Sequence, residues 1–527
     1  MKMRTMRTLM FLGASLLAIA PAAAQTASAM QDAPTVRPPA PPAANSDAPS
    51  ETLRDAMIQA YKTNPGMLAS RADLRATDEN VPIAKASGLP GATATSGVTR
   101  SIYDTSSTGF GPTTQATVGT NVSVPVYSGG GVRNQVKAAE TRVEAGRATL
   151  RTNEQQLFTD VVTVYLNVIR DEAIVRLNQE NVHVLEVNLQ ATRDRFEVGD
   201  LTRTDVAQSE ARLALAQSQL RSAEAQLISS RENYIRVVGS PPASLASPPQ
   251  LPNLPADVGT AVSTALKDNP SLESAQRARV ASKYDVGAAR SGTLPRVSLT
   301  LGSNYYNYLG TVGNPALYGS NDGVALTGGV QLQLPLFQGG RPAAQVRQAQ
   351  ARESQAIENV TSTERGVVAQ TRSAYAVWQS AMRVIDSTKV AVQANQLSLE
   401  GVRAENSVGS RTILDILNAE QELLNSQVQY VTAQRDAYVA GFALLASMGK
   451  AEAQDLGLDG GPLYDPAVHY KRVKNSFWDW SSDPAPVAEG TRTVDTPAQT
   501  AFTSAMVDPL LQQPVDTMRP NPPVVKK

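Results

Sequence analysis

Apolar residues recur at alternating spacings of three and four over a very long segment of the chain. The pattern runs from Leu157 to Phe196 and is interrupted at only three polar positions. A 3.5-residue period is typical of helices that coil around neighbouring helices with a left-handed supercoil. No proline occurs from 126 to 240, so a single long helix is expected there. A second segment repeats the period at Val367, Trp378, Ile385, Val392, Leu399 and Val402.

Gly199 ends the first long helix and predicts a helical hairpin. The sequence Gly-Asp-Leu-Thr interrupts the apolar pattern, and a return helix is expected from about 202 to 238. At about 1.5 Å per residue, the outgoing arm would be on the order of 100 Å long. An arm of that length does not fold into a compact globule.

Shorter helices are expected to complete the length of each return arm. A helix over about 258–290 follows a proline-rich break at 240–257. Laid end to end with the return helix, it has roughly the length of the long helix. The same holds for a return helix over 412–448 and an N-terminal helix over about 51–87. The pattern therefore predicts a helical cylinder with a break at mid-height.

The remaining segments alternate with period two, as half-exposed strands do. Two β-hairpins per chain are predicted, and the strand from Gly91 to Ile102 has the least clear pattern. Segments 104–114 and 308–323 are rich in Gly, Ser, Asn and Thr and suit water-facing loops. Four strands cannot close a membrane barrel, for which about eight is the smallest number, so the barrel must be shared between subunits. The alternating positions are Val118, Val122, Val124 and Val126, then Val297, Leu299 and Leu301, then Val330, Leu332, Leu334 and Leu336.

The sequence contains an internal duplication. Pro125-Val-Tyr-Ser-Gly-Gly matches Pro335-Leu-Phe-Gln-Gly-Gly at a shift of 210 positions, and further matches downstream keep this shift. Asn64-Pro65 matches Asn269-Pro270 at a shift of 205, so five residues were inserted in a segment where loops tolerate insertion. A repeat this long is one structural half of a subunit. The first repeat, 51–257, is predicted to contain a helix, a β-hairpin at about 91–126, a helical hairpin at about 130–238 and an equatorial segment at 240–257. The second repeat, 258–460, is predicted to contain a helix, a β-hairpin at about 295–337 and a helical hairpin at about 341–449. Residues 461–527 are expected to form an equatorial segment and a flexible tail.

The N-terminus has the features of an export signal. A basic start, an apolar run from Leu9 to Ala20 and a small-residue cleavage site predict a signal peptide over 1–24, and cleavage after Ala29 fits the same pattern. A Pro/Ala-rich linker follows over 25–50. The apolar run is shorter than the roughly 20 residues that a spanning helix needs, so any membrane insertion is expected to use β-strands.

Composition excludes several kinds of site. There is no cysteine, which rules out disulfides, thiolate metal sites and a lipidated N-terminal cysteine. Forty-eight basic residues balance 48 acidic ones, which gives no support for nucleic-acid binding. With only two histidines, a multi-histidine metal centre is implausible. No nucleophile, metal cluster or nucleotide loop is found, so neither enzymatic activity nor a cofactor is predicted.

From about Glu51 to Gly460 the chain resembles the TolC family of outer-membrane ducts. The resemblance rests on the two strand exits at Pro125 and Pro335 and on the two helical tips. It implies a homotrimer with a 12-stranded β-barrel in outer-membrane lipid and a 12-helix periplasmic tunnel. It also implies a periplasmic adaptor and an inner-membrane ABC or RND-type pump, with the chain as a passive exit duct for tripartite efflux or type I secretion in a Gram-negative envelope. The tips expected to meet the adaptor are Val198, Gly199, Val408 and Gly409.

The same resemblance implies a latch that closes the periplasmic end of the tunnel. Arg411 matches the arginine that contacts a threonine and an aspartate, here Thr204 and Asp205. A reinforcing tyrosine of the family is replaced by Asn406. The family's inner ring of two aspartates keeps only Asp415, because the second position is Asn418, which halves the charge of a ring that can bind cations.

Other interpretations of the same residues remain open on the sequence alone. Thr202-Arg-Thr-Asp205 and Thr412-Ile-Leu-Asp415 are also typical capping boxes at helix starts, and this role is compatible with a latch. A periplasmic adaptor also carries a long helical hairpin, but it is expected to have one hairpin flanked by compact β-domains. A structural coiled-coil protein of the envelope would not need amphipathic strands.

Overall fold

The computed structural model describes residues 50–102, 114–252, 254–311, 320–458, 464–503 and 511. The chain divides into two compact units, Met1–Ala48 and Pro49–Lys527, and every described residue belongs to the second unit. The predicted signal peptide and nearly all of the predicted linker therefore lie outside the described residues.

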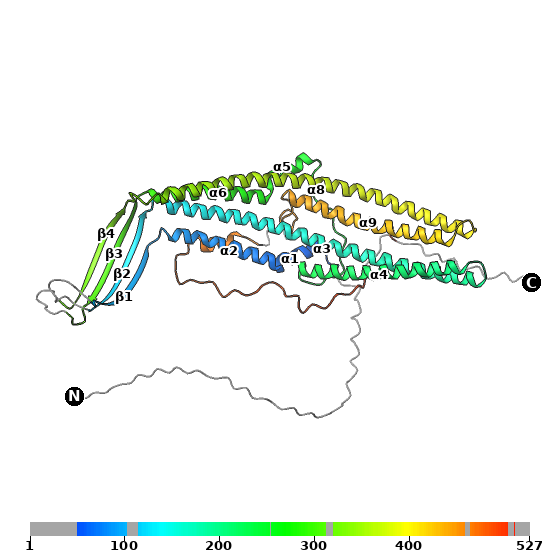
Figure 1. Cartoon of the computed structure of the whole chain (residues 1–527), viewed down its shortest axis with the longest axis horizontal. Helices are drawn as coiled ribbons and strands as arrows, with labels where there is room; N and C mark the ends of the chain where they lie inside the picture. The colour runs from blue at the N-terminus through cyan, green and yellow to red at the C-terminus, as the bar shows by residue number, and fades with distance from the viewer. Residues whose placement is uncertain are drawn as a thin grey trace, which may run out of the picture. The chain divides into compact units, whose positions relative to one another are not determined.

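Two long helical hairpins dominate the described residues. The first consists of α3 (Gly131–Glu197) and α4 (Arg203–Val238), and the second of α8 (Arg341–Ser407) and α9 (Ile413–Ser447). Both α3 and α8 have 67 residues, which corresponds to about 100 Å of helix. Figure 1 shows the strands at one end of these helices and the hairpin tips at the other.

The apolar seam of α3 is buried, as its period predicts. Eight of its nine apolar positions are buried, and Phe196, next to the tip, is exposed. The three polar positions that interrupt the seam are buried too and are hydrogen-bonded, since Asp171 accepts from Ser230, Asn178 donates to a backbone carbonyl and Thr192 does the same. Satisfied in this way, the polar residues do not break the helix packing.

The shorter helices are broken where a single helix was predicted. The segment at about 51–87 forms α1 (Leu53–Thr63) and α2 (Pro65–Ala86), and that at about 258–290 forms α5 (Val258–Asp268) and α6 (Pro270–Arg290) followed by η1 (Ser291–Thr293). The prediction of one helix in each place was wrong. A proline disfavours helical backbone in the residue before it, so Asn64 and Asn269 are both extended and each starts a new helix.

Each of these asparagines joins two helices. The side chain of Asn64 accepts from Gly66 N at the start of α2 and donates to Val237 O at the end of α4, both at 2.9 Å. Asn269 accepts from Ser271 N and donates to Ser447 O at the end of α9, again at 2.9 Å. The return helix of each hairpin therefore meets a shorter helix end to end, but the predicted partners were wrong. Helix α4 meets α2 and α9 meets α6, whereas the sequence lengths had paired 202–238 with 258–290 and 412–448 with 51–87.

The four strands form one antiparallel sheet in the order β1-β2-β3-β4. Their bounds are β1 (Gly91–Arg100), β2 (Thr114–Tyr127), β3 (Arg296–Asn307) and β4 (Asp322–Gln333). The expected continuation of the last strand to Leu336 was wrong, because β3 begins at Arg296, the partner of Gln333, and offers no residue for pairing beyond it. Most of the two predicted loops, at 103–113 and 312–319, lies outside the described residues.

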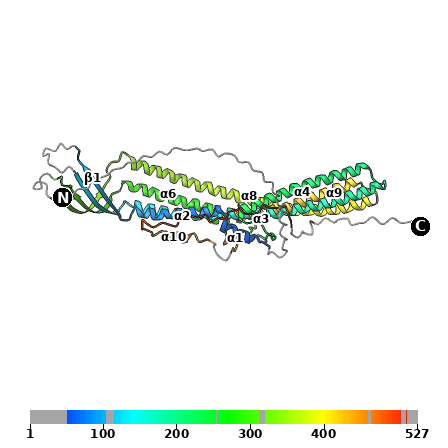
Figure 2. The same ribbon diagram turned by 90° about the horizontal axis from the view of Figure 1, so that it is seen from below.

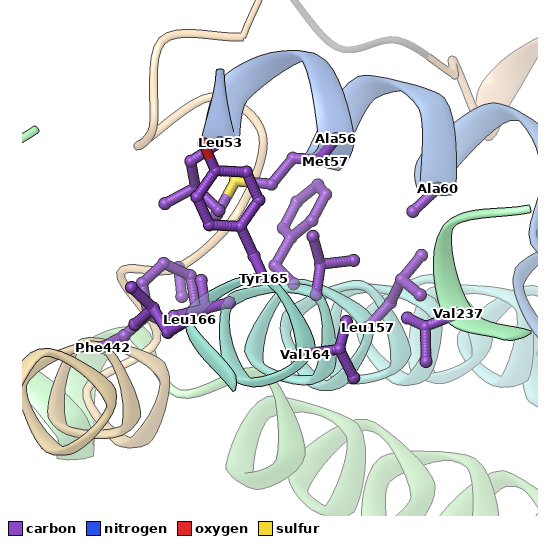
Figure 3. Close-up of a cluster of buried hydrophobic side chains, with 14 of the residues drawn as sticks. Leu53, Ala56, Met57, Ala60, Leu157, Val164, Tyr165, Leu166, Val237 and Phe442 are labelled. Atoms are coloured by element: carbon purple, nitrogen blue, oxygen red, sulfur yellow. The ribbon is translucent and has the colours of Figure 1, made fainter. Parts of the chain in front are cut away.

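The main core lies where α1 packs against α3. Figure 3 shows Leu53, Met57 and Ala60 of α1 above Leu157 and Tyr165 of α3. The hydroxyl of Tyr165 donates to Ala246 O at 2.6 Å and so holds the segment at 240–252 against the helices. This mid-height core is the part of the fold that positions the two long hairpins.

The C-terminal segment crosses the outside of this region. Helix α10 (Ala467–Val473) lies beside α2 (Figure 2). There, His469 Nδ1 is 3.0 Å from a carboxylate oxygen of Asp78. Further along, Arg231 of α4 donates to Phe502 O. The part of the predicted flexible tail at 512–527 lies outside the described residues.

Candidate functional site

One face of the sheet is apolar and exposed. Residues paired across strands share a face, and Val118, Tyr305 and Val324 form one such row. Val124, Leu299 and Val330 form another. Outward-facing apolar rows of this kind are typical of strands that contact lipid.

The opposite face is polar. Thr93, Asn121, Gly302 and Thr327 make one row across all four strands, and neighbouring rows contain Thr, Ser, Asn and Gly. This alternation matches a membrane strand with lipid on one side and water on the other. None of the described helices has both the length and the apolar character to cross a bilayer.

The sheet is open at both edges in the described chain. Strand β1 pairs only with β2, and β4 pairs only with β3, among the described residues. Unpaired backbone N–H and C=O groups are costly in a bilayer. The two edges therefore need strands from other chains.

The two hairpin tips are alike in backbone and exposure. Gly199 and Gly409 have φ of +83° and +82°, a left-handed conformation that favours glycine. The valines before them, Val198 and Val408, are 80% and 79% exposed. Both side chains are thus exposed, and the tips that carry them lie at the end of the helices furthest from the sheet (Figure 1).

Both return helices begin with a capping box. Thr202 and Asp205 exchange side-chain and backbone hydrogen bonds at the start of α4, and Thr412 and Asp415 do so at the start of α9. These bonds, first those with the backbone of the threonines, lower the pKa of both aspartates. The capping interpretation of these residues is confirmed.

The residues predicted to form the latch are not brought together within one chain. Arg411 Nε donates to Glu405 Oε2 at 2.7 Å, and this contact raises the pKa of the guanidinium. Asn406 Nδ2 donates to Arg411 O at 2.7 Å and so braces the same turn. Thr204 is exposed at the start of α4, and Asp205 is held by its own capping bond.

Asn418 lies between the two hairpins. Its side-chain oxygen accepts from Arg212 of α4 at 2.7 Å. The position expected to complete a ring of aspartates is therefore a neutral hydrogen-bonding partner of the first hairpin. Among the described residues, no cluster of three or more His, Asp or Glu side chains is placed to hold a metal ion.

Sequence reasoning missed one group of residues near the tips. Glu420 of α9 is buried and accepts from Asn188 of α3 at 2.7 Å and from Arg403 of α8 at 3.2 Å. A signal was available, since Arg193 and Glu210 of the first hairpin lie 210 positions before Arg403 and Glu420. The duplication thus repeats an arginine and a glutamate 17 residues apart.

Comparison with known proteins identifies the family. The model of the outer membrane efflux protein family matches residues 57–240 and 261–450, which correspond to the two repeats without the C-terminal segment. The chain belongs to this family. The TolC-like resemblance drawn from the strand exits and tips is thereby confirmed.

Curated relatives agree with this assignment over most of the chain. The outer membrane efflux protein BepC of Brucella suis biovar 1 (strain 1330) is 35% identical, and the match covers 81% of this chain and 92% of BepC. The alkaline protease secretion protein AprF of Pseudomonas aeruginosa is 28% identical over 58% of this chain and 64% of AprF.

Solved structures show the same fold. The Campylobacter jejuni CmeC outer membrane channel superposes with a TM-score of 0.67 at 17% identity, over 80% of this chain and 89% of CmeC. The fold predicted for each chain is confirmed, because a four-stranded sheet and long helical hairpins are shared with these outer-membrane channels.

As a member of this family, the chain is an outer-membrane exit duct that extends into the periplasm. Family members and relatives are channel proteins. The alternatives of a periplasmic adaptor and a structural coiled-coil protein are set aside, because the family match spans both hairpins and the strands between them.

Proposed function

We propose that three copies of this chain form a passive outer-membrane duct that has no catalytic step of its own. The observation that carries the proposal is a four-stranded sheet with one apolar face and two unpaired edges. Three such sheets give twelve strands, enough to close a barrel and pair every edge. The helices then continue the barrel as a tunnel into the periplasm.

We further propose that the tips dock a periplasmic adaptor, which connects the duct to an energised inner-membrane pump of the ABC or RND type. The two tips support this, because each ends in a left-handed glycine turn beside an exposed valine, Val198 or Val408, at the end of the helices furthest from the sheet. Tripartite efflux is the favoured role, since BepC is named an efflux protein and matches 81% of the chain. Type I secretion is the alternative, since AprF is named for protease secretion.

The latch is proposed to form between neighbouring chains. Within one chain Arg411 contacts Glu405, while Asp205 is occupied by its capping bond with Thr202. A second chain can bring Thr204 and Asp205 to the Arg411 turn without breaking either local contact, because a guanidinium has five N–H donors and a carboxylate has two acceptor oxygens. Three copies of Asp415 around one axis would then face the lumen at the narrow end.

The assembly itself is tested by extraction and mass. Membranes of cells that express the full chain are washed with carbonate, extracted with detergent and analysed by native mass spectrometry. The proposal predicts that the protein stays in the washed membranes and is extracted as a trimer. A carbonate-soluble protein, or a membrane monomer that does not associate, would contradict the proposal.

A further inference from the structure

The duplication places the same ion pair in both hairpins but in different surroundings. Arg193 and Glu210 in the first hairpin are both 50% exposed, with the donor and acceptor atoms 2.6 Å apart. The matching pair in the second hairpin, Arg403 and Glu420, is 16% and 1% exposed. One sequence feature has therefore become a surface ion pair in one copy and a buried one in the other.

The buried pair has a third partner that, among the described residues, the exposed pair lacks. Asn188 of α3 donates its side-chain amide to Glu420 Oε1 at 2.7 Å, and Arg403 of α8 donates to the same oxygen. Helix α9 carries the carboxylate, so a single oxygen atom joins three helices from both hairpins. The position that matches Asn188 in the second repeat is Ser398, whose short side chain is a different donor.

The other carboxylate oxygen is buried without a partner. Glu420 Oε2 accepts no hydrogen bond among the described residues. Arg403 is the charged group that faces the carboxylate, Asn188 is neutral, and Arg212 of α4 binds Asn418 two residues earlier. Leaving a buried acceptor unsatisfied costs free energy. The hydrogen bonds to Oε1 stabilise the contact, whereas the loss of water from Oε2 destabilises it.

We propose that Glu420 is a proton-linked clamp that ties the second hairpin to α3 near the periplasmic end and sets how readily the hairpins separate. The proposal rests on the duct function, because separation of the hairpins there would open the tunnel. It concerns different residues from the latch at the Arg411 turn. The exposed pair of Arg193 and Glu210 occupies the matching positions in the first hairpin and has no clamping role.

Protonation is expected to strengthen the clamp. Burial raises the pKa of Glu420 in the packed state, whereas in separated hairpins the carboxyl returns towards its ordinary value. The state with the higher pKa binds the proton more tightly, so falling pH favours the packed hairpins. Each unit of difference in pKa shifts the equilibrium by up to about tenfold.

Two substitutions of Glu420 are expected to act in opposite directions. Glu420→Gln keeps an oxygen that accepts from Asn188 and Arg403 and removes the cost of burying a charge, so the hairpins stay packed and their separation no longer depends on pH. Glu420→Ala removes the acceptor and leaves both donors without it, so the hairpins separate more easily. The matched controls, Glu210→Gln and Glu210→Ala, change a half-exposed pair and should leave the response unchanged.

The separation is measured directly by electron spin resonance. The chain has no cysteine, so Val408→Cys carries a single spin label on each copy of the assembled channel. The distance between labels is recorded from about pH 4 to about pH 8, a range that starts near the ordinary glutamate pKa. The expected distance lengthens with pH in the parent protein, stays short in Glu420→Gln and stays long in Glu420→Ala.

The clamp is contradicted if both Glu420 variants follow the parent protein, or if the Glu210 variants change the distances as much as the Glu420 variants do. This measurement requires no conduction. A parent protein that shows the predicted distances but forms no channel in a bilayer would refute the duct and leave the clamp standing. A conducting channel whose distances ignore Glu420 would refute the clamp alone.

Discussion

At the scale of single residues, two asparagines carry the junctions between helices. Asn64 and Asn269 each cap the helix that follows and donate to the last turn of a return helix from another part of the sequence. The sequence showed the repeated Asn-Pro pairs but not their bonds across to Val237 and Ser447. A spacing pattern records which residues recur, whereas a cross-helix bond depends on tertiary packing.

Replacing either asparagine by alanine is expected to destabilise the tunnel. Loss of a helix cap costs about 1 kcal/mol, and a buried carbonyl left without its donor adds about 1–3 kcal/mol. Asn269 is buried and Asn64 is half-buried, so Asn269→Ala should be the more damaging change. Urea unfolding of the helices, followed by circular dichroism, measures both. Equal midpoints for the parent and the two variants would argue against the junctions.

At the scale of elements, the spacing of apolar residues predicted whether a segment is a helix or a strand better than it predicted where that helix or strand begins and ends. The seam from Leu157 onward and the alternation in β2 to β4 were sufficient for two helical hairpins and four strands. The break at Asn64 was missed because the apolar pattern continues across it. The buried Glu420 was missed because its burial depends on how α9 packs on α3, which no local pattern contains.

The two faces of the sheet give a matched pair of substitutions. Leu326 lies on the apolar face of β4, and Thr327, the next residue, lies on the polar face. Leu326→Lys is expected to cost about 2–4 kcal/mol, as a charge facing lipid near the middle of a membrane strand does, while Thr327→Lys should be tolerated. The yield of detergent-extracted trimer from the outer membrane measures the difference. Equal yields for the two variants would show that the apolar face does not contact lipid.

At the scale of the whole molecule, one chain presents incomplete surfaces at both ends. Among the described residues, β1 and β4 each have one free edge, and Arg411 and Asp205, predicted for the latch, make only local contacts. Both observations are explained if neighbouring copies of the chain pair with the two strand edges and bring Asp205 to Arg411. The sequence predicted this because four strands are too few for a membrane barrel, and the open edges agree.

The central claim is that the chain forms a duct whose periplasmic end is held closed by Arg411. The most direct test is single-channel conductance of the purified trimer in a planar bilayer, with the parent protein beside Arg411→Ala. We expect a small conductance that prefers cations, because the proposed trimer turns Asp415 towards the lumen, and a larger conductance in Arg411→Ala, because the proposed latch is lost. A verified trimer that conducts no ions, or a conductance that Arg411→Ala leaves unchanged, would contradict the account.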